Sequence, residues 1–325
     1  MTILITGASG FLGNGIIKEL KKRKLEARCV FRKIEKYFQT KNSIIDNYYF
    51  EDINSSTDWS EALANIDCVI HCIGRAHIIK DNHKVSLLEY KKINVDITRN
   101  LAEQASLFGV KRFIFISTIG VNGICTDSST YFKSDDSPAP FNHYTDSKYE
   151  AEKILKEISN KTGLEIVIIR PPLIYGPGVK GNFLRLLNLI DSRIPLPLSK
   201  INNLRSYIGL DNLVDLIIRC TYHPAAKGKI FLACDGEDLS TTDLIKKIAK
   251  EMKINIFLFY LPIFILRMAS SLIGFRKEVD RLVESLQIDY SYTRKVLGWT
   301  PPLSLNKGLK KMISDYLQKK RSINK

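Results

Sequence analysis

Residues 2–13 read TILITGASGFLG, and this stretch decides the fold. The run TILI is short and apolar, as in a buried strand, and a helical pattern begins at Phe11. Between the two lie Gly7, Gly10 and Gly13 in a G-x-x-G-x-x-G spacing. Glycines at such a turn let the backbone bend tightly and approach a diphosphate, which binds at the helix N-terminus. The stretch therefore predicts a dinucleotide-binding strand–turn–helix unit.

The first half of the chain continues to alternate short apolar runs with helical patterns. We expect strands at Thr2–Ile5, Ala27–Phe31, Tyr48–Phe50, Cys68–Cys72, Phe113–Ser117 and Ile166–Ile169, and helices at Phe11–Lys24, Leu87–Phe108 and Tyr144–Thr162. This alternation predicts an α/β fold, a Rossmann-type doubly wound parallel sheet covered by helices on both faces.

The composition changes after Arg170, where the sequence becomes rich in proline and glycine (PPLIYGPGVKGNF). We expect the dinucleotide-binding domain to span residues 1–175 and a smaller, mainly substrate-binding lobe to span residues 176–325. A late strand at Phe231–Ala233 indicates that the chain returns to the main sheet near residues 205–240.

The end of the second strand bears on the choice of cofactor. A Rossmann domain places an acid there for the ribose hydroxyl of NAD, or an arginine for the 2′-phosphate of NADP. This chain has Arg32 and Lys33 at that point, and Glu35 comes only afterwards. Since a guanidinium grips a phosphate, NADP(H) is favoured and NAD(H) is the alternative; a solvated basic strand end would be the merely structural explanation.

The candidate catalytic pair is Tyr144 and Lys148 in the sequence YTDSK at the start of a helix. Residues four apart share a helix face, so the phenol and the ammonium can point into one site. A nearby ammonium lowers the pKa of a phenol, which lets Tyr144 exchange a proton with a substrate oxygen. The fifth strand ends at Ser117 and Thr118, and ligands gather at the carboxyl ends of parallel strands. We therefore expect the Thr118 hydroxyl to hold the reacting oxygen, with Ser117 as the second choice.

These motifs together resemble the extended short-chain dehydrogenases/reductases that act on nucleotide sugars, a family that includes UDP-glucose 4-epimerases. The resemblance rests on the glycine motif, the Ser/Thr of the fifth strand, Tyr-x-x-x-Lys and the run RPPLIYGPG from Arg170 to Gly178. It covers nearly the whole chain. It implies that the catalytic residues are Thr118, Tyr144 and Lys148, and that the cofactor is bound by Gly7, Gly10, Phe11, Leu12, Gly13, Arg32, Asp52, Ile53, Asn94, Tyr144, Lys148 and Pro171.

The resemblance also implies a UDP-sugar as substrate. It assigns the nucleoside diphosphate to Asn182, Leu198 in a strand Leu196–Leu198, Arg205 and, with less certain placement, Arg281. Arg75 and His77 follow the fourth strand and are expected to line the sugar pocket, although a lone histidine is as often structural.

Two reactions and one non-catalytic role fit this set of residues. The run RPPLIYGPGVKGNFLRLL, the R-x-H-x-x-x-D pattern from Arg75 and the stretches DGEDLST and LGWTPP are most similar to a bacterial subgroup that contains 4-keto reductases forming UDP-N-acetylquinovosamine for O-antigen or capsule. We therefore expect hydride transfer at C4 with reduction of a UDP-4-keto-6-deoxy-N-acetylhexosamine. The alternatives are a UDP-hexose 4-epimerase and, from another class, a non-catalytic NADP-sensing protein. Ile119 and Gly120 follow Thr118 where related dehydratases carry acids, which disfavours dehydration.

Composition adds limits on partners and compartment. The formal charge is +15, but the densest basic run, KELKKRK, falls on the solvent side of an expected helix, so no nucleic-acid partner is expected. Six scattered cysteines without a C-x-x-C pair favour a reducing cytoplasm and no structural metal. A homodimer is compatible with the resemblance.

One apolar stretch, INIFLFYLPIFILRMASSLIGF from Ile254 to Phe275, raises the question of a membrane. Pro262 and Arg267 interrupt it, and an arginine at the bilayer centre costs about 2.5–3.5 kcal/mol. We expect no transmembrane segment but a buried or amphipathic helix, with peripheral attachment to the inner membrane as the alternative.

Overall fold

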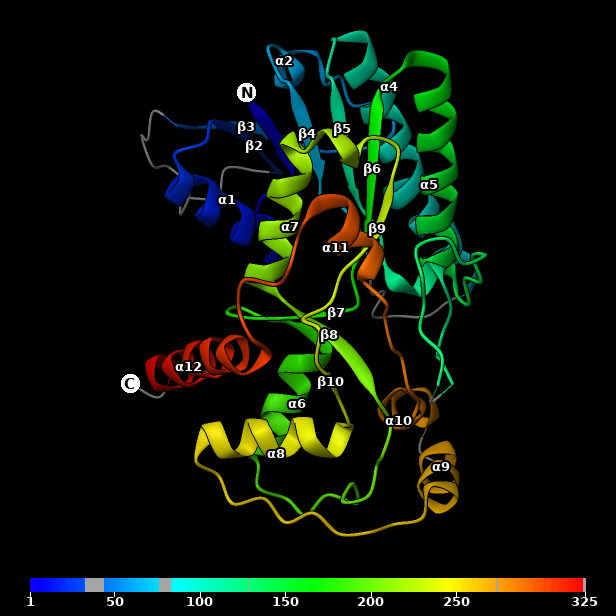
Figure 1. Ribbon diagram of the computed structural model, residues 1–325, viewed down its shortest axis with the longest axis vertical. Helices are drawn as coiled ribbons and strands as arrows, with labels where there is room; N and C mark the ends of the chain where they lie inside the picture. The colour runs from blue at the N-terminus through cyan, green and yellow to red at the C-terminus, as the bar shows by residue number, and fades with distance from the viewer. Residues whose placement is uncertain (33–43, 76–82, 128, 273, 324–325) are drawn as a thin grey trace.

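The computed structural model describes residues 1–32, 44–75, 83–127, 129–272 and 274–323. Its centre is a seven-stranded parallel sheet (Figure 1). In spatial order the strands are β3 (Ile45–Phe50), β2 (Ala27–Arg32), β1 (Ile3–Thr6), β4 (Cys68–His71), β5 (Arg112–Ile116), β6 (Glu165–Arg170) and β9 (Ile230–Leu232). The predicted strands and the late return to the sheet are confirmed.

The order of the strands reverses between β1 and β4, because Ile3 pairs with Ala27 of β2 on one side and with Cys68 of β4 on the other. A parallel sheet binds its ligands outside the carboxyl ends of the strands at such a reversal. The glycine motif follows β1 directly, so the topology brings it to this position.

Two apolar layers cover the sheet, as continuous apolar strands require. One face is covered by α1 (Phe11–Arg23), α7 (Leu210–Tyr222) and α11 (Ser291–Leu297), and the other by α2 (Ser60–Leu63), α4 (Ile97–Leu107) and α5 (His143–Thr162). Figure 1 shows the two sets of helices on either side of the strands.

A smaller body, which we call the small lobe, lies below the carboxyl edge of the main sheet in Figure 1. It has its own apolar core. Its elements are the sheet β10 (Asp238–Leu239), β8 (Arg205–Gly209) and β7 (Leu173–Tyr175), together with α6 (Gly181–Asp191), α8 (Thr241–Met252), α9 (Ile263–Leu272), α10 (Arg276–Val283) and α12 (Leu305–Ile323). The division of the chain at residue 175 stays a proposal, since β7 and β8 pair within the small sheet while α7, between β8 and β9, packs on the main sheet.

Two expected elements differ from the structure. The helix expected at Leu87–Phe108 consists of α3 (His83–Tyr90), a π-helical turn (Lys91–Asp96) and α4. Wide turns of this kind are frequent at functional sites. The strand expected at Leu196–Leu198 is a single bridge between Leu196 and Leu258.

Candidate functional site

The glycine motif forms a cradle that no side chain could enter. Gly7 has a φ of +71°, and a Cβ atom there would lie 2.8 Å from the carbonyl carbon of Cys72. A Cβ at Gly13 would lie 2.3 Å from the carbonyl oxygen of Gly7. The amide of Gly10 donates to the same oxygen at 3.0 Å. The turn therefore requires glycine at the positions that let β1 run straight into α1.

The start of α1 has the properties of an anion site. Gly10 is the N-cap, no side chain caps the helix, and the first turn holds no acidic residue. Backbone N–H groups and the positive end of the helix dipole thus face the strand-order reversal. Phe11 and Leu12 are partly buried against the main core. These features fit the diphosphate of a dinucleotide.

The expected specificity residues lie together at the ends of β2 and β3. Arg32 is the exposed last residue of β2 and is in register with Phe50. The pKa of the Asp52 carboxyl is lowered, first by a hydrogen bond from Asn54 and further by the charge of Arg32. Ile53 is buried beneath them. The acid therefore stands after β3 rather than at the end of β2, and Lys33 and Glu35 lie outside the described residues.

The three expected catalytic residues are brought together. Asn142 and Thr145 form a capping box that starts α5 at His143, which places Tyr144 in the first helical turn. Thr118 follows β5, and its hydroxyl lies close enough to the phenol of Tyr144 to lower the pKa of that group. Lys148 lies one turn further along α5 and is 3% exposed, with its Nζ 4.2 Å from the centre of the Phe115 ring.

Burial controls the protonation of this group. It raises the pKa of Tyr144 to about 12, and the neighbouring Thr118 hydroxyl only partly offsets this. It also lowers the pKa of Lys148 to about 8, against the opposing charges of Cys72 and Glu152. The expectation that Lys148 depresses the pKa of Tyr144 is therefore not met in the protein without ligands, because loss of hydration dominates for both groups.

A buried ion pair lies behind Lys148. Arg170 and Glu152 are each 1% exposed, and the guanidinium donates to both carboxylate oxygens at 2.9 and 2.5 Å. Ser117 donates to the same carboxylate at 2.5 Å, and Arg170 also reaches Asn122 at 2.9 Å. The hydroxyl of Ser117 is thus engaged inside the protein, which favours Thr118 as the group that meets substrate.

Asn94 joins two segments around the site, and its expected role in cofactor binding stays a prediction. Its Oδ1 accepts from the Arg75 amide at 2.9 Å, and its Nδ2 donates to the Arg75 carbonyl at 3.2 Å and to Ser147 Oγ at 2.9 Å. Its side chain is fully buried. Asn94 therefore holds the loop after β4 against α5. Its side chain reaches both because the π-helical turn points it inward.

Gly74 belongs to the same loop and was not among the site residues predicted from the sequence. A Cβ at Gly74 would lie 3.4 Å from Nζ of Lys148 and 3.6 Å from Oδ1 of Asn94. A single glycine after a strand gives no sequence signal for such a close approach. Arg75 forms an ion pair with Glu89 at 2.9 Å. His77 and Asp81 lie outside the described residues.

Pro171 closes the site from the β6 side. Its carbonyl accepts from the Ile119 amide at 3.0 Å, which joins the loop after β6 to the loop that carries Thr118. Pro171 is buried at the carboxyl edge of the sheet. That Pro171 borders the nicotinamide stays a prediction.

The residues expected to hold the nucleoside diphosphate are only partly brought together. Arg205 donates to the backbone carbonyls of Arg281 and Glu284 at 3.0 and 2.9 Å, so it also caps the C-terminal end of α10. Arg281 is exposed on that helix, and Asn182 stands in the first turn of α6. Leu198 is 5% exposed within the core of the small lobe. Its side chain is covered by its neighbours in that core, and its expected role in holding the nucleoside diphosphate stays a prediction.

His71 is a buried side chain near the site that was not identified from the sequence. It ends β4, and its Nδ1 and Nε2 lie 2.7 Å from Thr6 Oγ1 and 3.0 Å from Thr98 Oγ1. Burial and the nearby charge of Lys148 lower its pKa to about 3. The imidazole is therefore neutral and joins β1, β4 and α4 beneath the site.

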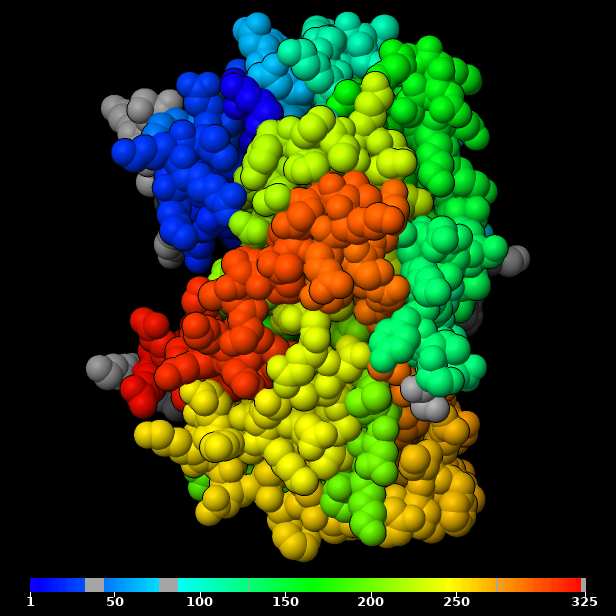
Figure 2. Space-filling model, viewed as in Figure 1, coloured from blue at the N-terminus to red at the C-terminus, as the bar shows by residue number. Residues whose placement is uncertain are grey.

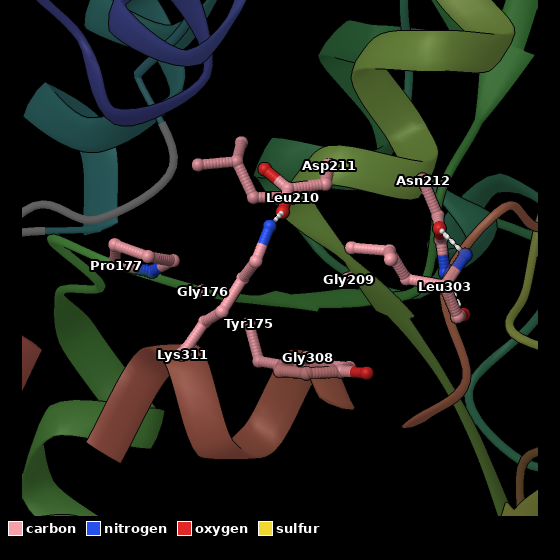
Figure 3. Close-up of a pocket in the computed structure, with 10 residues that line it drawn as sticks. All are labelled: Tyr175, Gly176, Pro177, Gly209, Leu210, Asp211, Asn212, Leu303, Gly308 and Lys311. Carbon is pink, nitrogen blue, oxygen red and sulfur yellow. Dashed lines mark hydrogen bonds and ion pairs between the residues drawn. The ribbon is translucent and has the colours of Figure 1, made fainter. Parts of the chain in front are cut away.

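A small pocket lies where the small lobe meets the main sheet (Figure 3). Its cavity of about 10 Å³ has room for roughly one water molecule. Asn212 exchanges two hydrogen bonds with the backbone of Leu303, and Lys311 reaches from α12 to Asp211 at 2.5 Å. The pocket is a structural junction between α7 and α12.

In the described part of the chain, no cluster of three His, Cys, Asp or Glu side chains is arranged to hold a metal.

Comparisons with known proteins identify the family of this chain. Residues 3–234 match the NAD dependent epimerase/dehydratase family. The chain is 41% identical over 320 residues to a UDP-glucose 4-epimerase of Vibrio cholerae, covering 98% of this chain and 96% of the relative. It is 26% identical to a dTDP-4-dehydro-6-deoxyglucose reductase of Escherichia coli, covering 96% of each.

The fold is also that of solved epimerases. The structure of a UDP-glucuronic acid 4-epimerase from Bacillus cereus in complex with NAD superposes with a TM-score of 0.78 at 23% identity, over 98% of this chain and 99% of the other. The chain therefore belongs to the NAD dependent epimerase/dehydratase family of extended short-chain dehydrogenases/reductases.

Proposed function

We propose that the protein reduces C4 of a UDP-linked 4-keto-6-deoxy-N-acetylhexosamine to give UDP-N-acetylquinovosamine, a sugar donor for a bacterial surface polysaccharide. The observation that carries the proposal is the neighbouring Thr118 and Tyr144, with Lys148 one turn away on α5, at the carboxyl edge that holds the glycine cradle. A hydroxyl, a phenol and an ammonium are the groups that hydride chemistry at a sugar carbon needs.

Each side chain then has one task. When bound, the reduced dinucleotide supplies the hydride. Thr118 holds the C4 carbonyl oxygen by a hydrogen bond. Tyr144 gives its proton to that oxygen as hydride arrives at C4, so that the ketone becomes a secondary alcohol. The ammonium of Lys148 stabilises the phenolate that remains until solvent returns the proton.

The protonation of Tyr144 is compatible with the reductive step. With a pKa of about 12, Tyr144 carries its proton at neutral pH and is ready to act as the acid. Oxidation of an alcohol would need the phenolate at the start. The exposed Arg32 at the end of β2 supports NADPH as an exchangeable reductant, with NADH as the alternative.

A UDP-hexose 4-epimerase is the second candidate. The Vibrio cholerae relative, similar over almost the full length, supports it. An epimerase oxidises and reduces the same sugar, so it retains its cofactor and consumes none. Tyr144 would then act as base in the first half-reaction and as acid in the second.

One experiment separates the candidates. The purified protein is incubated with the UDP-4-keto sugar and NADPH or NADH, and separately with UDP-N-acetylglucosamine or UDP-glucose without added cofactor, and products are resolved by NMR. The proposal predicts consumption of one NADPH per product and no conversion in the second mixture. Conversion of the second mixture would establish the epimerase instead. If neither mixture is converted, both enzyme candidates are contradicted and the non-catalytic nucleotide-sensing protein is favoured.

A further inference from the structure

The outer surface of α9 is apolar where a surface helix is normally polar. Phe264, Met268 and Leu272 are four residues apart and are 70%, 60% and 84% exposed. The opposite side of the helix is the one that meets protein, since Ser270 is buried and Arg267 forms ion pairs with Asp280 and Glu284. The stripe on α9 is therefore left uncovered by the fold.

Aromatic residues on both sides extend this stripe. Phe257 and Tyr260 precede α9, Phe275 follows it, and all three are more than half exposed. We call the stripe and these three residues the α9 face. The segment before α9 is held in place, because Leu196 exchanges backbone hydrogen bonds of 3.0 Å with Phe257 and Phe259. The α9 face thus gathers six exposed apolar or aromatic side chains within 19 residues of the sequence, which is unusual for a surface segment.

The α9 face occupies one end of the molecule. Figure 2 shows the yellow and gold atoms of this part of the chain at the lower end of the small lobe, away from the blue and cyan atoms of the main sheet. A surface at the end of an elongated body can meet a flat partner without obstruction from the rest of the chain.

The sequence on either side of the α9 face is rich in basic residues. The sequence 253–283 holds five Lys or Arg against two acidic residues, and 192–204 adds two basic residues and no acid. Lys200 lies over the ring of Tyr260 at 5.2 Å, and Lys253 and Arg276 are exposed. Two of the neighbouring acids, Asp280 and Glu284, are already paired with arginines of α9 and α10.

We propose that the α9 face docks the protein on a bilayer that contains anionic phospholipids. Aromatic and aliphatic side chains flanked by Lys and Arg are the chemistry of helices that lie in a membrane interface, and anionic headgroups attract the basic rim. Across the described parts of the chain, no helix is both long and apolar enough to cross a bilayer. The α9 helix therefore lies on the surface of the membrane.

A second copy of the chain fits this surface less well. A two-fold symmetric contact would place each α9 face against itself. The basic rim, Lys200, Lys253 and Arg276, would then approach its own copy. A lipid surface of opposite charge has the complementarity that such a contact lacks.

Docking also orients the candidate site. α10 packs beside α9 through the ion pair of Arg267 with Asp280 at 2.8 Å, and Arg205 binds the C-terminal carbonyls of α10. The inference does not depend on the reaction proposed above, because it rests on residues outside the Thr118–Tyr144–Lys148 group.

Co-sedimentation with vesicles tests the inference. The full-length protein is mixed with vesicles of phosphatidylcholine alone or with phosphatidylglycerol added. We expect binding to the anionic vesicles, weakening with salt, and little binding to phosphatidylcholine. Replacing both Phe264→Ser and Met268→Ser should lower the partition coefficient by at least about 10-fold, because two side chains no longer leave water.

The matched control is Tyr222→Ser. Tyr222 is 56% exposed at the end of α7, beside Arg112 at the amino edge of the main sheet and so away from α9. This variant should bind vesicles like the unmodified chain, and all variants should keep their thermal unfolding midpoint and their turnover of soluble substrate.

Three results would overturn the inference. The unmodified chain could stay in the supernatant with anionic vesicles, or the double variant could bind as strongly as the unmodified chain. In the third, light scattering would show a dimer for the unmodified chain and a monomer for the double variant, and neither protein would bind vesicles. That result would assign the α9 face to a contact between two copies of the chain.

Discussion

At the scale of single residues, the candidate site depends on how burial sets the charge of two groups. Tyr144 keeps its proton far above neutral pH, while Lys148 loses its proton near pH 8. Both directions follow from removing the charged form from water. The catalytic group is therefore an acid beside an ammonium that is only just retained at physiological pH.

Lys148 should control the pH dependence of the proposed reduction. The profile of kcat/KM reports groups in the free enzyme, so we expect it to fall as pH rises through about 8, where Lys148 loses its charge. Tyr144 should add no second fall below about pH 10. In Lys148→Arg the guanidinium stays charged, and the alkaline fall should move above pH 10 in whatever activity remains. An unchanged profile in this variant would argue against the assignment.

The ion pair behind Lys148 should dominate local stability. Glu152→Gln leaves the guanidinium of Arg170 buried without its counter-charge, and the expected loss in free energy of unfolding is about 3–5 kcal/mol. The matched control is Glu19→Gln, which removes an exposed i,i+4 partner of Arg23 and should cost less than about 1 kcal/mol. Urea denaturation measures both. Equal losses in the two variants would contradict the account.

At the scale of elements, the segments that follow β1, β4, β5 and β6 supply the site. Buried side-chain hydrogen bonds hold several of these elements together. Thr6, His71 and Thr98 join β1, β4 and α4. Asn94 joins the loop after β4 to α5. These contacts explain why the π-helical turn persists, because it directs the side chain of Asn94 inward.

His71 should make the fold sensitive to acid. Its pKa is about 3 in the fold against about 6.5 when unfolded, so the neutral form is the one that folding selects. Its contribution is complete above pH 6.5 and is lost as pH falls from about 6.5 towards 3, by about 1.4 kcal/mol per pH unit. The variant His71→Gln should be less stable at pH 7.5 but lose less stability between pH 7.5 and 5. Parallel urea midpoints for both proteins over that range would contradict this.

At the scale of the whole molecule, the main sheet was predictable because its strands are short, apolar and separated by helical patterns. The small sheet was not, because β7, β8 and β10 are two to five residues long and their pairing depends on distant segments. That Thr118, Tyr144 and Lys148 lie near one another was predictable from Tyr-x-x-x-Lys and the strand end at Thr118; their catalytic roles stay a prediction. Glu152, Gly74 and His71 were not, since their roles exist only after α5, the β4 loop and α4 come together.

The surface of the molecule also has one feature that the sequence predicts and one that it does not. The apolar run Ile254–Phe275 was visible in the sequence, and a buried or amphipathic helix was expected there. That its apolar side faces outward follows only from the packing of α9 against α10.

The most direct test of the central claim is single-turnover reduction of the UDP-4-keto sugar by Tyr144→Phe. This change removes one hydroxyl and keeps the ring that packs against Tyr90. If Tyr144 donates the proton to the C4 oxygen, the rate should fall by about 10²–10⁴-fold while dinucleotide binding and the thermal midpoint stay unchanged. A rate within a few-fold of the unmodified enzyme would contradict the account.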